Sequence, residues 1–354
     1  MNASAPNSAD ADLARRLPKV LLHEHLDGDL RVQTLFELMQ QQRVPSPAAD
    51  VPTLAAWFQA RAHAGSLTEY LQGFALTVAA MAAPAALERV AYEAAEDALA
   101  QGCVLAEFRI APLLFEAHGL GGEATVEALL AGLARSRLPS GLIVCAMRHL
   151  DPAETLRAAR LALAYQGRGV VGFDLAGPEF GFPAGDHAQA LALVRDAGLA
   201  ITLHAGEADI ADRVVEAARL GATRVGHGVH LVDGLRDPAR RHLVDEVIAR
   251  GVHLEVCPTS NVHTGAAASI AAHPITELWG AGVSLSYHTD NTLMSCITHS
   301  GEAEQLLRET SLTVTDLLRM GLQAAQHSFL PAAQREAAAA RLQAWALAEG
   351  LDLG

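Results

Sequence analysis

In the segment Val20-Leu21-Leu22-His23-Glu24-His25-Leu26-Asp27-Gly28, a short apolar run leads directly into a cluster of polar side chains. We predict a strand over Val20–His25, because short runs rich in Val and Leu are typical of buried strands. Seven further runs of this character are also predicted as strands: Val104–Ile110, Leu142–Met147, Val170–Asp174, Ala200–His204, Arg224–Gly226, His253–Val256 and Val283–Tyr287. Longer amphipathic, Ala-rich stretches between the runs are predicted as helices: Pro84–Gln101, Pro152–Tyr165, His187–Ala197, Ile210–Leu220, Gly234–Arg250 and Pro274–Gly280.

Alternation of strands and helices implies parallel strands joined by helical crossovers. Eight such units, with no change of amino-acid composition that would mark a second domain, favour a closed barrel over an open doubly wound sheet. The sequence therefore predicts the α/β class and a single (β/α)8 TIM barrel. The segment Asp29–Gln101 is longer than an ordinary βα unit, so it should carry extra helices over the barrel mouth, and further helices should follow His299. We expect a flexible tail over residues 1–14 and one barrel domain over residues 15–354.

Composition and charge limit the classes of partner. The 354 residues carry a formal net charge of −14, which disfavours binding to nucleic-acid backbones and suits a small neutral or cationic substrate better. The acidity alternatively serves only solubility. The four cysteines are far apart and form no C-x-x-C pair, as expected for free thiols in a reducing compartment. Neither a signal peptide nor a transmembrane run is evident, so we expect a cytoplasmic protein without membrane or nucleic-acid partners. Its oligomeric state is left open.

Polar residues stand at the ends of five predicted strands. The groups are His23-Glu24-His25-Leu26-Asp27, Asp174-Leu175-Ala176-Gly177, His204-Ala205-Gly206-Glu207, Gly226-His227-Gly228 and His288-Thr289-Asp290-Asn291. In a barrel, the carboxyl ends of the strands meet on one face, where active sites are built. We therefore expect these residues, which are distant in sequence, to surround one pocket.

A metal site is the favoured interpretation of four of these residues. His23 and His25 are two residues apart in a strand, so their side chains project to the same side. His204 and Asp290 would complete a set of three imidazoles and one carboxylate, which suits zinc and leaves room for a water molecule. The H-x-H pair alone is weak, because ordinary surface or core histidines show the same spacing. Its combination with the other groups, each at a strand end, favours the metal site.

The remaining polar residues have roles that the chemistry of a pocket suggests. Glu207 could move a proton to a substrate ring nitrogen if burial raises its pKa, or it could cap the next helix. His227 lies between two glycines and could orient a water molecule or accept its proton, or be a packed histidine in a turn. Gly177 offers a backbone N–H for close contact with a flat ring, or is an ordinary turn glycine. Histidines in helical or loop contexts are predicted to be exposed or locally bonded: His63, His118, His187, His242, His263, His273, His299 and His327.

From about Pro18 to Pro331 the chain resembles the adenosine deaminase family of the amidohydrolase superfamily. The resemblance rests on segments that occur in the family's order: PKVLLHEHLDG, VLAEFRIAP, CAMRHL, VVGFDLAGPE, ITLHAGE, RVGHGVHL, LEVCPTSNV and VSLSYHTDN. The CAMRHL and CPTSNV segments are similar to those of bacterial members. The resemblance implies hydrolytic deamination of a 6-aminopurine nucleoside, which converts adenosine or 2′-deoxyadenosine to inosine or 2′-deoxyinosine and ammonia.

The resemblance also implies a mechanism. One Zn²⁺ ion would be bound by His23, His25, His204 and Asp290. Zinc lowers the pKa of its water toward about 7, generating hydroxide near neutral pH. His227 and Asp290 would hold and deprotonate this water for attack on C6 of the purine. Glu207 is similar to the residue that donates a proton to purine N1.

Four residues would contact the substrate by the same resemblance: His25, Asp27, Gly177 and Asn291. Asp27 would accept a ribose hydroxyl, and the N–H of Gly177 would donate to purine N3. An apolar lid is expected at Leu67, Tyr70, Leu71 and Phe74. Their i, i+3, i+4, i+7 spacing gives an apolar helix face, which core packing would explain equally well.

The chain departs from the family at the end of its last strand. The family usually reads Asn-Thr-Asp-Asp there, and this chain reads His288-Thr289-Asp290-Asn291. The amide of Asn291 can donate to purine N7 without a protonated carboxyl group. His288 is predicted to support the site from a deeper layer or to be a packed barrel histidine. Three alternatives stay open: adenine as substrate, a 5′-modified adenosine such as aminodeoxyfutalosine, or another hydrolase of the superfamily.

Overall fold

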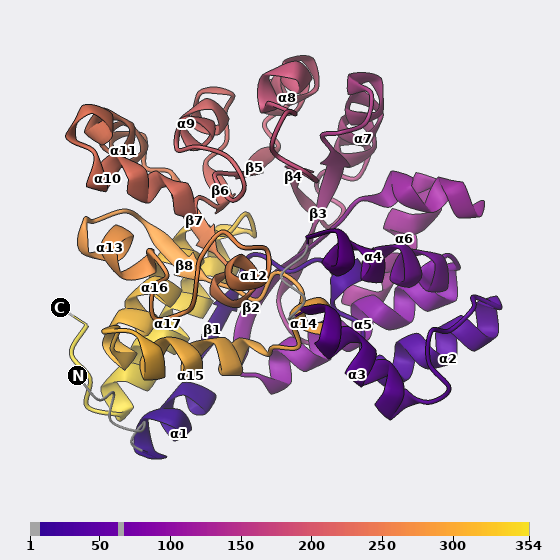
Figure 1. The fold of residues 1–354 in the computed structure, drawn as a ribbon, viewed down its shortest axis with the longest axis horizontal. Helices are drawn as coiled ribbons and strands as arrows, with labels where there is room; N and C mark the ends of the chain where they lie inside the picture. The colour runs from indigo at the N-terminus through magenta and orange to yellow at the C-terminus, as the bar shows by residue number, and fades with distance from the viewer. Residues whose placement is uncertain (1–7, 63–66, 354) are drawn as a thin grey trace.

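Eight parallel strands form one sheet in chain order, β1 to β8, which confirms the predicted barrel. The computed structural model describes residues 8–62 and 67–353, and of residues 8–11 and 67–72 it describes only the backbone. The strands are β1 Lys19–Leu21, β2 Cys103–Ile110, β3 Ser140–Met147, β4 Val170–Ala176, β5 Ala200–Ala205, β6 Arg224–His227, β7 His253–Val256 and β8 Leu285–Tyr287. The helices surround them in chain order (Figure 1).

The barrel closes between the segments that follow β8 and β1. The N–H of His25 donates to the carbonyl of Asp290 at 2.8 Å, and the N–H of Asp290 donates to the carbonyl of His23 at 3.1 Å. The regular strand β1 is shorter than the predicted Val20–His25, because the N–H of Leu22 donates to Nδ1 of the His288 ring instead of to a carbonyl. The residues that close the barrel are therefore also the predicted metal ligands.

The long segment between β1 and β2 carries extra helices, as predicted, and its described part contains four, α2 to α5. The last turn before them, Leu26–Gly28, packs against α4, and Thr77 of α4 donates from Oγ1 to the carbonyl of Asp27 at 2.6 Å. Further helices follow β8, and α16 packs against both β8 and β1. The helices of the first half are α1 Ser8–Arg16, α2 Val32–Gln42, α3 Val51–Ala62, α4 Leu67–Met81, α5 Pro84–Ala100, α6 Gly122–Leu133, α7 Pro152–Ala164 and α8 Ala188–Asp196. Those of the second half are α9 Asp212–Arg219, α10 Asp233–Arg236, α11 Arg241–Ala249, α12 Pro258–His263, α13 Ile275–Gly280, α14 Thr292–Ser295, α15 His299–Glu309, α16 Val314–His327 and α17 Ala332–Ala348.

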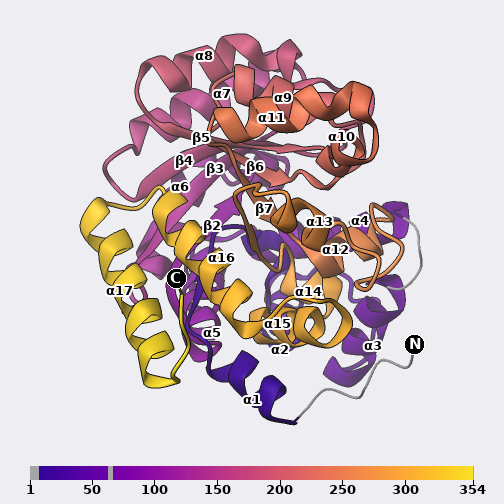
Figure 2. The same ribbon diagram turned by 90° about the vertical axis from the view of Figure 1, so that its left-hand side faces the viewer.

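Two further predicted segments differ from the structure. The helix predicted over Gly234–Arg250 is broken between α10 and α11, because Pro238 has no N–H to continue it and the Asp237 side chain accepts the N–H of Ala239 at 2.9 Å. Helix α1 begins inside the tail predicted for residues 1–14, and Ala14 is buried. It packs against α15 beside the C-terminal helices (Figure 2).

Within the described residues, no single helix is both long and apolar enough to cross a membrane.

Candidate active site

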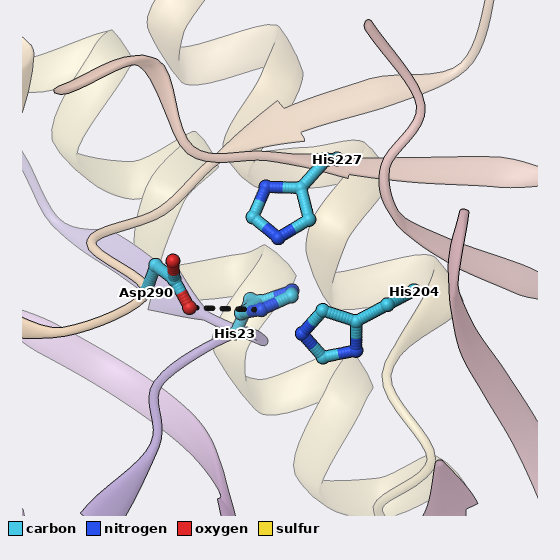
Figure 3. Close-up of side chains that lie close together, drawn as sticks. All are labelled: His23, His204, His227 and Asp290. Carbon is cyan, nitrogen blue, oxygen red and sulfur yellow. Dashed lines mark ion pairs between the residues drawn. The ribbon is translucent and has the colours of Figure 1, made fainter. Parts of the chain in front are cut away.

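Four polar side chains point toward one another at the carboxyl ends of the strands (Figure 3). They are those of His23, His204, His227 and Asp290, and one potential ligand atom from each lies within 4.8 Å of all the others. The strands β5 and β6 carry His204 and His227, and the segments after β1 and β8 carry the other two. The barrel therefore brings together residues from four strand ends, as the sequence predicts.

The distances between donor atoms fit a single metal ion. Oδ1 of Asp290 lies 3.3 Å from Nε2 of His23 and 3.4 Å from Nε2 of His25. Nε2 of His25 lies 3.1 Å from Nε2 of His204. Tetrahedral bonds of about 2.0–2.1 Å place neighbouring donors about 3.3 Å apart. In addition, Nε2 of His23 is buried and makes no hydrogen bond within the described part of the chain. These spacings fit a zinc-sized ion on the four predicted ligands, whereas the cluster whose ligand atoms all lie within 4.8 Å of one another contains His227 in place of the predicted His25.

The opposite ring nitrogens of two candidate ligands face buried carboxylates. Nδ1 of His23 lies 2.9 Å from Oε2 of Glu255, and Nδ1 of His204 lies 2.9 Å from Oδ2 of Asp174. Such carboxylates accept a hydrogen bond from Nδ1–H, which leaves the Nε2 lone pair directed at a metal and makes Nε2 more basic. The arrangement fits histidines that are oriented to bind a metal ion.

A buried ion network, which was not predicted from the sequence, fixes these carboxylates. Arg109 binds Asp174 at 2.8 Å and Glu255 at 2.6 Å, and Arg224 binds Glu255 at 2.6 Å and Glu107 at 2.7 Å. Burial opposes ionisation of Asp174, but His204 and Arg109 hold its pKa well below the usual range. Burial likewise opposes ionisation of Glu255, whose pKa the two arginines lower strongly. Charged residues inside otherwise apolar strands are the signal that could have revealed the network.

Glu207 faces the cluster and does not cap a helix. Its Oε2 lies 3.5 Å from Nε2 of His227, and its Oε1 accepts hydrogen bonds from Thr264 Oγ1 at 2.9 Å and Asn261 Nδ2 at 3.3 Å. The loop that carries it is held by Glu179, whose carboxylate accepts the N–H of Glu207 at 3.0 Å. The alternative of a helix cap is therefore wrong, and the carboxyl group of Glu207 is free to face a substrate.

Two site residues have strained backbones. His227 has φ 64° and Asp290 has φ 62°, the left-handed region that costs about 1–3 kcal/mol for a residue with a side chain. His227 is the last residue of β6, and Asp290 lies three residues after the end of β8; in both, the turn directs the side chain into the barrel mouth. Close packing enforces the same geometry, because a Cβ at Gly226 would lie 2.8 Å from Cε1 of His23. A single sequence does not reveal such strain.

A cavity of about 400 Å³ opens above the cluster. All four residues predicted to contact the substrate line it: His25, Asp27, Gly177 and Asn291. Burial raises the pKa of Asp27 to about 7. The backbone of Gly177 has φ 94°, and a Cβ there would come within 3.1 Å of Nδ1 of His149, so only glycine gives a flat ring this close approach. The predicted binding residues therefore share one cavity.

The structure places one residue of the predicted lid at the cavity, and it places His288 inside the barrel. Phe74 of α4 lines the cavity, whereas the side chains of Leu67, Tyr70 and Leu71 lie outside the described residues, as does His63. His288 is fully buried and is bonded to Leu22 and to Oγ of Ser286, at 2.7 Å from its Nε2. These contacts are those of a packed barrel histidine whose ring, in place of a backbone carbonyl, accepts the N–H of Leu22.

Helix α12 supplies side chains for which the sequence predicts no role. Oγ of Ser260 donates to Oδ2 of Asp290 at 2.6 Å, which leaves Oδ1 of Asp290 facing the histidines. Asn261 bonds to both Glu207 and His227. The start of the helix is held by buried Glu302 of α15, whose Oε1 accepts the N–H of Thr259 at 2.9 Å. The quoted CPTSN segment contained these residues, but their contacts are not visible in it.

Glu302 predicts a pH dependence of stability. Burial raises its pKa from 4.5 to about 7, so the folded chain binds more protons than the unfolded chain between these values. Its stabilising contribution is complete below pH 4.5 and is lost as the pH rises through 7, by about 3 kcal/mol. Urea unfolding of the metal-free proteins measures the difference in free energy of unfolding between Glu302→Gln and the unaltered protein. This difference should be about 3 kcal/mol more favourable to Glu302→Gln at pH 8 than at pH 5. The exposed Glu336→Gln control should show no such gain, and parallel pH curves for all three proteins would contradict the assignment.

Comparisons with known proteins agree with this geometry. A family model described as adenosine deaminase matches residues 18–345. An adenosine deaminase of Mycobacterium ulcerans (strain Agy99) is 40% identical over 335 residues, which cover 90% of this chain and 92% of that protein. The structure of adenine deaminase from Arthrobacter aurescens is similar with a TM-score of 0.84 and 24% identity, covering 94% of this chain and 99% of the other. An amidohydrolase from Burkholderia ambifaria with bound Zn has a TM-score of 0.85 and 24% identity, covering 99% of this chain and 97% of the other.

At such identities the two solved structures support the barrel fold alone, whereas the family model and the M. ulcerans relative span nearly the whole chain. The chain therefore belongs to the adenosine deaminase family and is a deaminating hydrolase.

Proposed function

We propose that this enzyme hydrolyses the 6-amino group of adenosine and 2′-deoxyadenosine, releasing ammonia and inosine or 2′-deoxyinosine. The main observation behind this proposal is the position of Glu207. Its Oε2 lies 3.5 Å from Nε2 of His227 in the candidate metal site. Glu207 also lines the cavity that Asp27, Gly177 and Asn291 share. A proton donor next to an activated water is what hydrolysis at a ring carbon needs, because ring protonation makes C6 electrophilic. The similarity to adenosine deaminases over 90% of the chain supports this assignment.

We propose one zinc ion per chain on four ligands: His23, His25, His204 and Asp290. Support comes from the donor spacings of 3.1–3.4 Å and from the donor set of three imidazoles and one carboxylate, which suits zinc. The structurally similar amidohydrolase from B. ambifaria was solved with bound Zn. When bound, zinc would lower the pKa of a coordinated water molecule from 15.7 to about 7. His227 belongs to the same cluster, but we assign it to the attacking water because its Nε2 faces Glu207.

The other steps of the proposed reaction are assigned to individual residues of the site. Glu207 gives a proton to purine N1 and is held in place by Thr264 and Asn261. His227 orients the attacking water toward C6. Asp290, anchored by Ser260 through Oδ2, keeps Oδ1 on the side of the histidines. Asp27 accepts a ribose hydroxyl, the N–H of Gly177 donates to N3, and the Asn291 amide donates to N7.

Metal binding can be tested residue by residue. Chelation is expected to abolish deamination, and one equivalent of zinc per chain should restore it. His25→Ala is expected to lower zinc affinity more than His227→Ala, because only His25 is proposed as a ligand. Competition titration with a chromophoric chelator measures both affinities, and elemental analysis gives the stoichiometry. A larger loss of affinity in His227→Ala would instead favour the set His23, His204, His227 and Asp290.

The cavity favours a neutral sugar over an anionic 5′ group. The described residues that line it include the carboxyl group of Asp27 and no Arg or Lys side chain. A 5′-phosphate would therefore meet no fixed cation. Free adenine would leave Asp27 without a partner.

A substrate screen tests the proposal. Ammonia release should be fastest, by kcat/KM, for adenosine and 2′-deoxyadenosine, and at least about 10-fold slower for adenine, adenosine monophosphate and aminodeoxyfutalosine, since each loses or misplaces about one hydrogen bond. Glu207→Gln provides the blank. Faster turnover of adenine or of a 5′-modified adenosine would overturn the assignment, and ammonia release from none of them would favour another hydrolase of the superfamily.

Asn291→Asp is expected to change the pH dependence. Asn291 is 3% exposed, and its amide packs directly on Gly28, where a Cβ would overlap it. An aspartate held there can donate to purine N7 only when protonated, so kcat/KM should fall about 10-fold at pH 8 and recover toward acidic pH. Asn291→Ala should lose the same donor without a pH-dependent recovery. Unchanged activity and an unchanged pH profile in Asn291→Asp would contradict the role.

We further propose that residues 15–354 form one domain and that the protein is cytoplasmic. The four free cysteines support a reducing compartment. The proposed partner is the purine nucleoside alone.

A further inference from the structure

His273 is a buried histidine that the sequence predicts to be exposed or locally bonded. It is 3% exposed, and burial lowers its pKa to about 3, so it is neutral and carries one ring proton. Its Nδ1 accepts the N–H of Ile275 at 3.1 Å. The proton must therefore reside on Nε2, which lies 3.3 Å from Oδ1 of Asn261 and donates to it.

This donor fixes the orientation of the Asn261 amide. With Oδ1 accepting from His273, the Nδ2 group has two protons for two acceptors, Nδ1 of His227 at 3.1 Å and Oε1 of Glu207 at 3.3 Å. A flipped amide would place its oxygen against the Glu207 carboxylate and its N–H groups against Nε2–H of His273. Both contacts would be repulsive, and Asn261 is fully buried, so no water molecule can relieve them.

The chain of donors ends on His227. Its Nδ1 accepts a hydrogen bond from the N–H of Asn261, so neutral His227 carries its own proton on Nε2. That nitrogen is the one that lies 3.5 Å from Oε2 of Glu207 and belongs to the strand-end cluster.

We propose that His273 and Asn261 are positioning residues that lock His227 in the Nε2–H tautomer, so that His227 gives a hydrogen bond to the attacking water and does not take its proton. This inference rests on the proposed function for its catalytic meaning, but the tautomer itself belongs to the folded chain. Neither residue touches the reacting atoms. Both act through the ring of His227, and Asn261 also acts on Glu207.

The tautomer can be measured without substrate or metal. Protein with ¹⁵N-labelled histidine is made metal-free, and multiple-bond ¹H–¹⁵N spectra identify which ring nitrogen of His227 is protonated, with His227→Asn providing the assignment. The unaltered protein should show a protonated Nε2. In Asn261→Asp the new carboxylate accepts from His227, so the proton should move to Nδ1. A protonated Nδ1 in the unaltered protein, or an unchanged tautomer in Asn261→Asp, would overturn the proposal.

Two variants of His273 test the same tautomer independently of Asn261→Asp. His273→Gln can still donate to Asn261 and should keep the Nε2–H tautomer, whereas His273→Leu cannot and should give a mixture of both tautomers. His299→Leu is the matched control, because His299 is also 3% exposed with a pKa lowered to about 3 by burial, but lies outside this chain of hydrogen bonds. A mixture in His299→Leu, or a single Nε2–H form in His273→Leu, would contradict the relay.

Kinetics distinguish positioning from general structural damage. Asn261→Asp should lower kcat by about 10- to 100-fold, the cost of losing a partner that orients a catalytic group, with KM changed less than about 3-fold. An equal fall in kcat and rise in KM, with the tautomer unchanged, would count against the role. If the unaltered enzyme deaminates no nucleoside, the proposed function fails, and the tautomer measurement still decides this inference.

Discussion

Glu207→Gln is expected to lower kcat for adenosine by about 10²- to 10⁴-fold, the range that a positioned proton donor contributes. Glutamine is isosteric with glutamate and can still accept from Thr264, which lies 2.9 Å from Oε1. What it lacks is an acidic proton for purine N1. The glutamine NH2 group can still donate to N1 of adenosine, so the KM for adenosine should stay within about 3-fold of the unaltered value.

Stopped assays of ammonia release at varied adenosine concentration give both kcat and KM. Thr264→Val is the graded companion, because it removes one hydrogen bond to Glu207 but leaves the carboxyl group and the Asn261 contact at 3.3 Å. It should cost about 10-fold at most. A Glu207→Gln enzyme that keeps more than a tenth of its turnover would exclude Glu207 as the proton donor.

The fold could be predicted closely because its signals are local. Each of the eight apolar runs became a strand in the predicted order, and the long segment before β2 became four helices. The errors occurred where side chains compete with the backbone. The ring of His288 takes the N–H of Leu22 and shortens β1, and Asp237 with Pro238 breaks the helix predicted over Gly234–Arg250. Neither competition can be seen in hydrophobic periodicity.

The inner residues of the site could be predicted for a similar reason. His23, His204 and Asp290 each stand at a strand end, and a barrel gathers strand ends on one face. Their supporting residues could not, because the pairings join distant parts of the chain: Glu255 reaches His23 across 232 positions, and Asn261 reaches Glu207 across 54. A single sequence shows charged residues inside strands but not which of them meet.

Arg109→Met is expected to be strongly destabilising. Arg109 is fully buried, and its guanidinium binds Asp174 at 2.8 Å and Glu255 at 2.6 Å. Removing one partner of a buried ion pair leaves the other charge uncompensated and costs about 3–5 kcal/mol. Methionine fills most of the volume, so the loss comes from charge. Arg109→Lys should be intermediate, because an ammonium group cannot bridge two carboxylates as the planar guanidinium does.

The same substitution should weaken metal binding, which separates this network from ordinary packing. Asp174 and Glu255 contact Nδ1 of His204 and His23, so loss of Arg109 disturbs two proposed ligands, with an expected fall in zinc affinity of about 10- to 100-fold. Urea unfolding of the metal-free proteins and competitive zinc titration measure the two effects. Arg241→Met is the control: its side chain is 49% exposed and pairs with Asp245 four residues on, which should contribute less than about 0.5 kcal/mol. If Arg109→Met lay within about 1 kcal/mol of that control, the network would be dispensable, and the orientation of His23 and His204 would have to come from the barrel backbone alone.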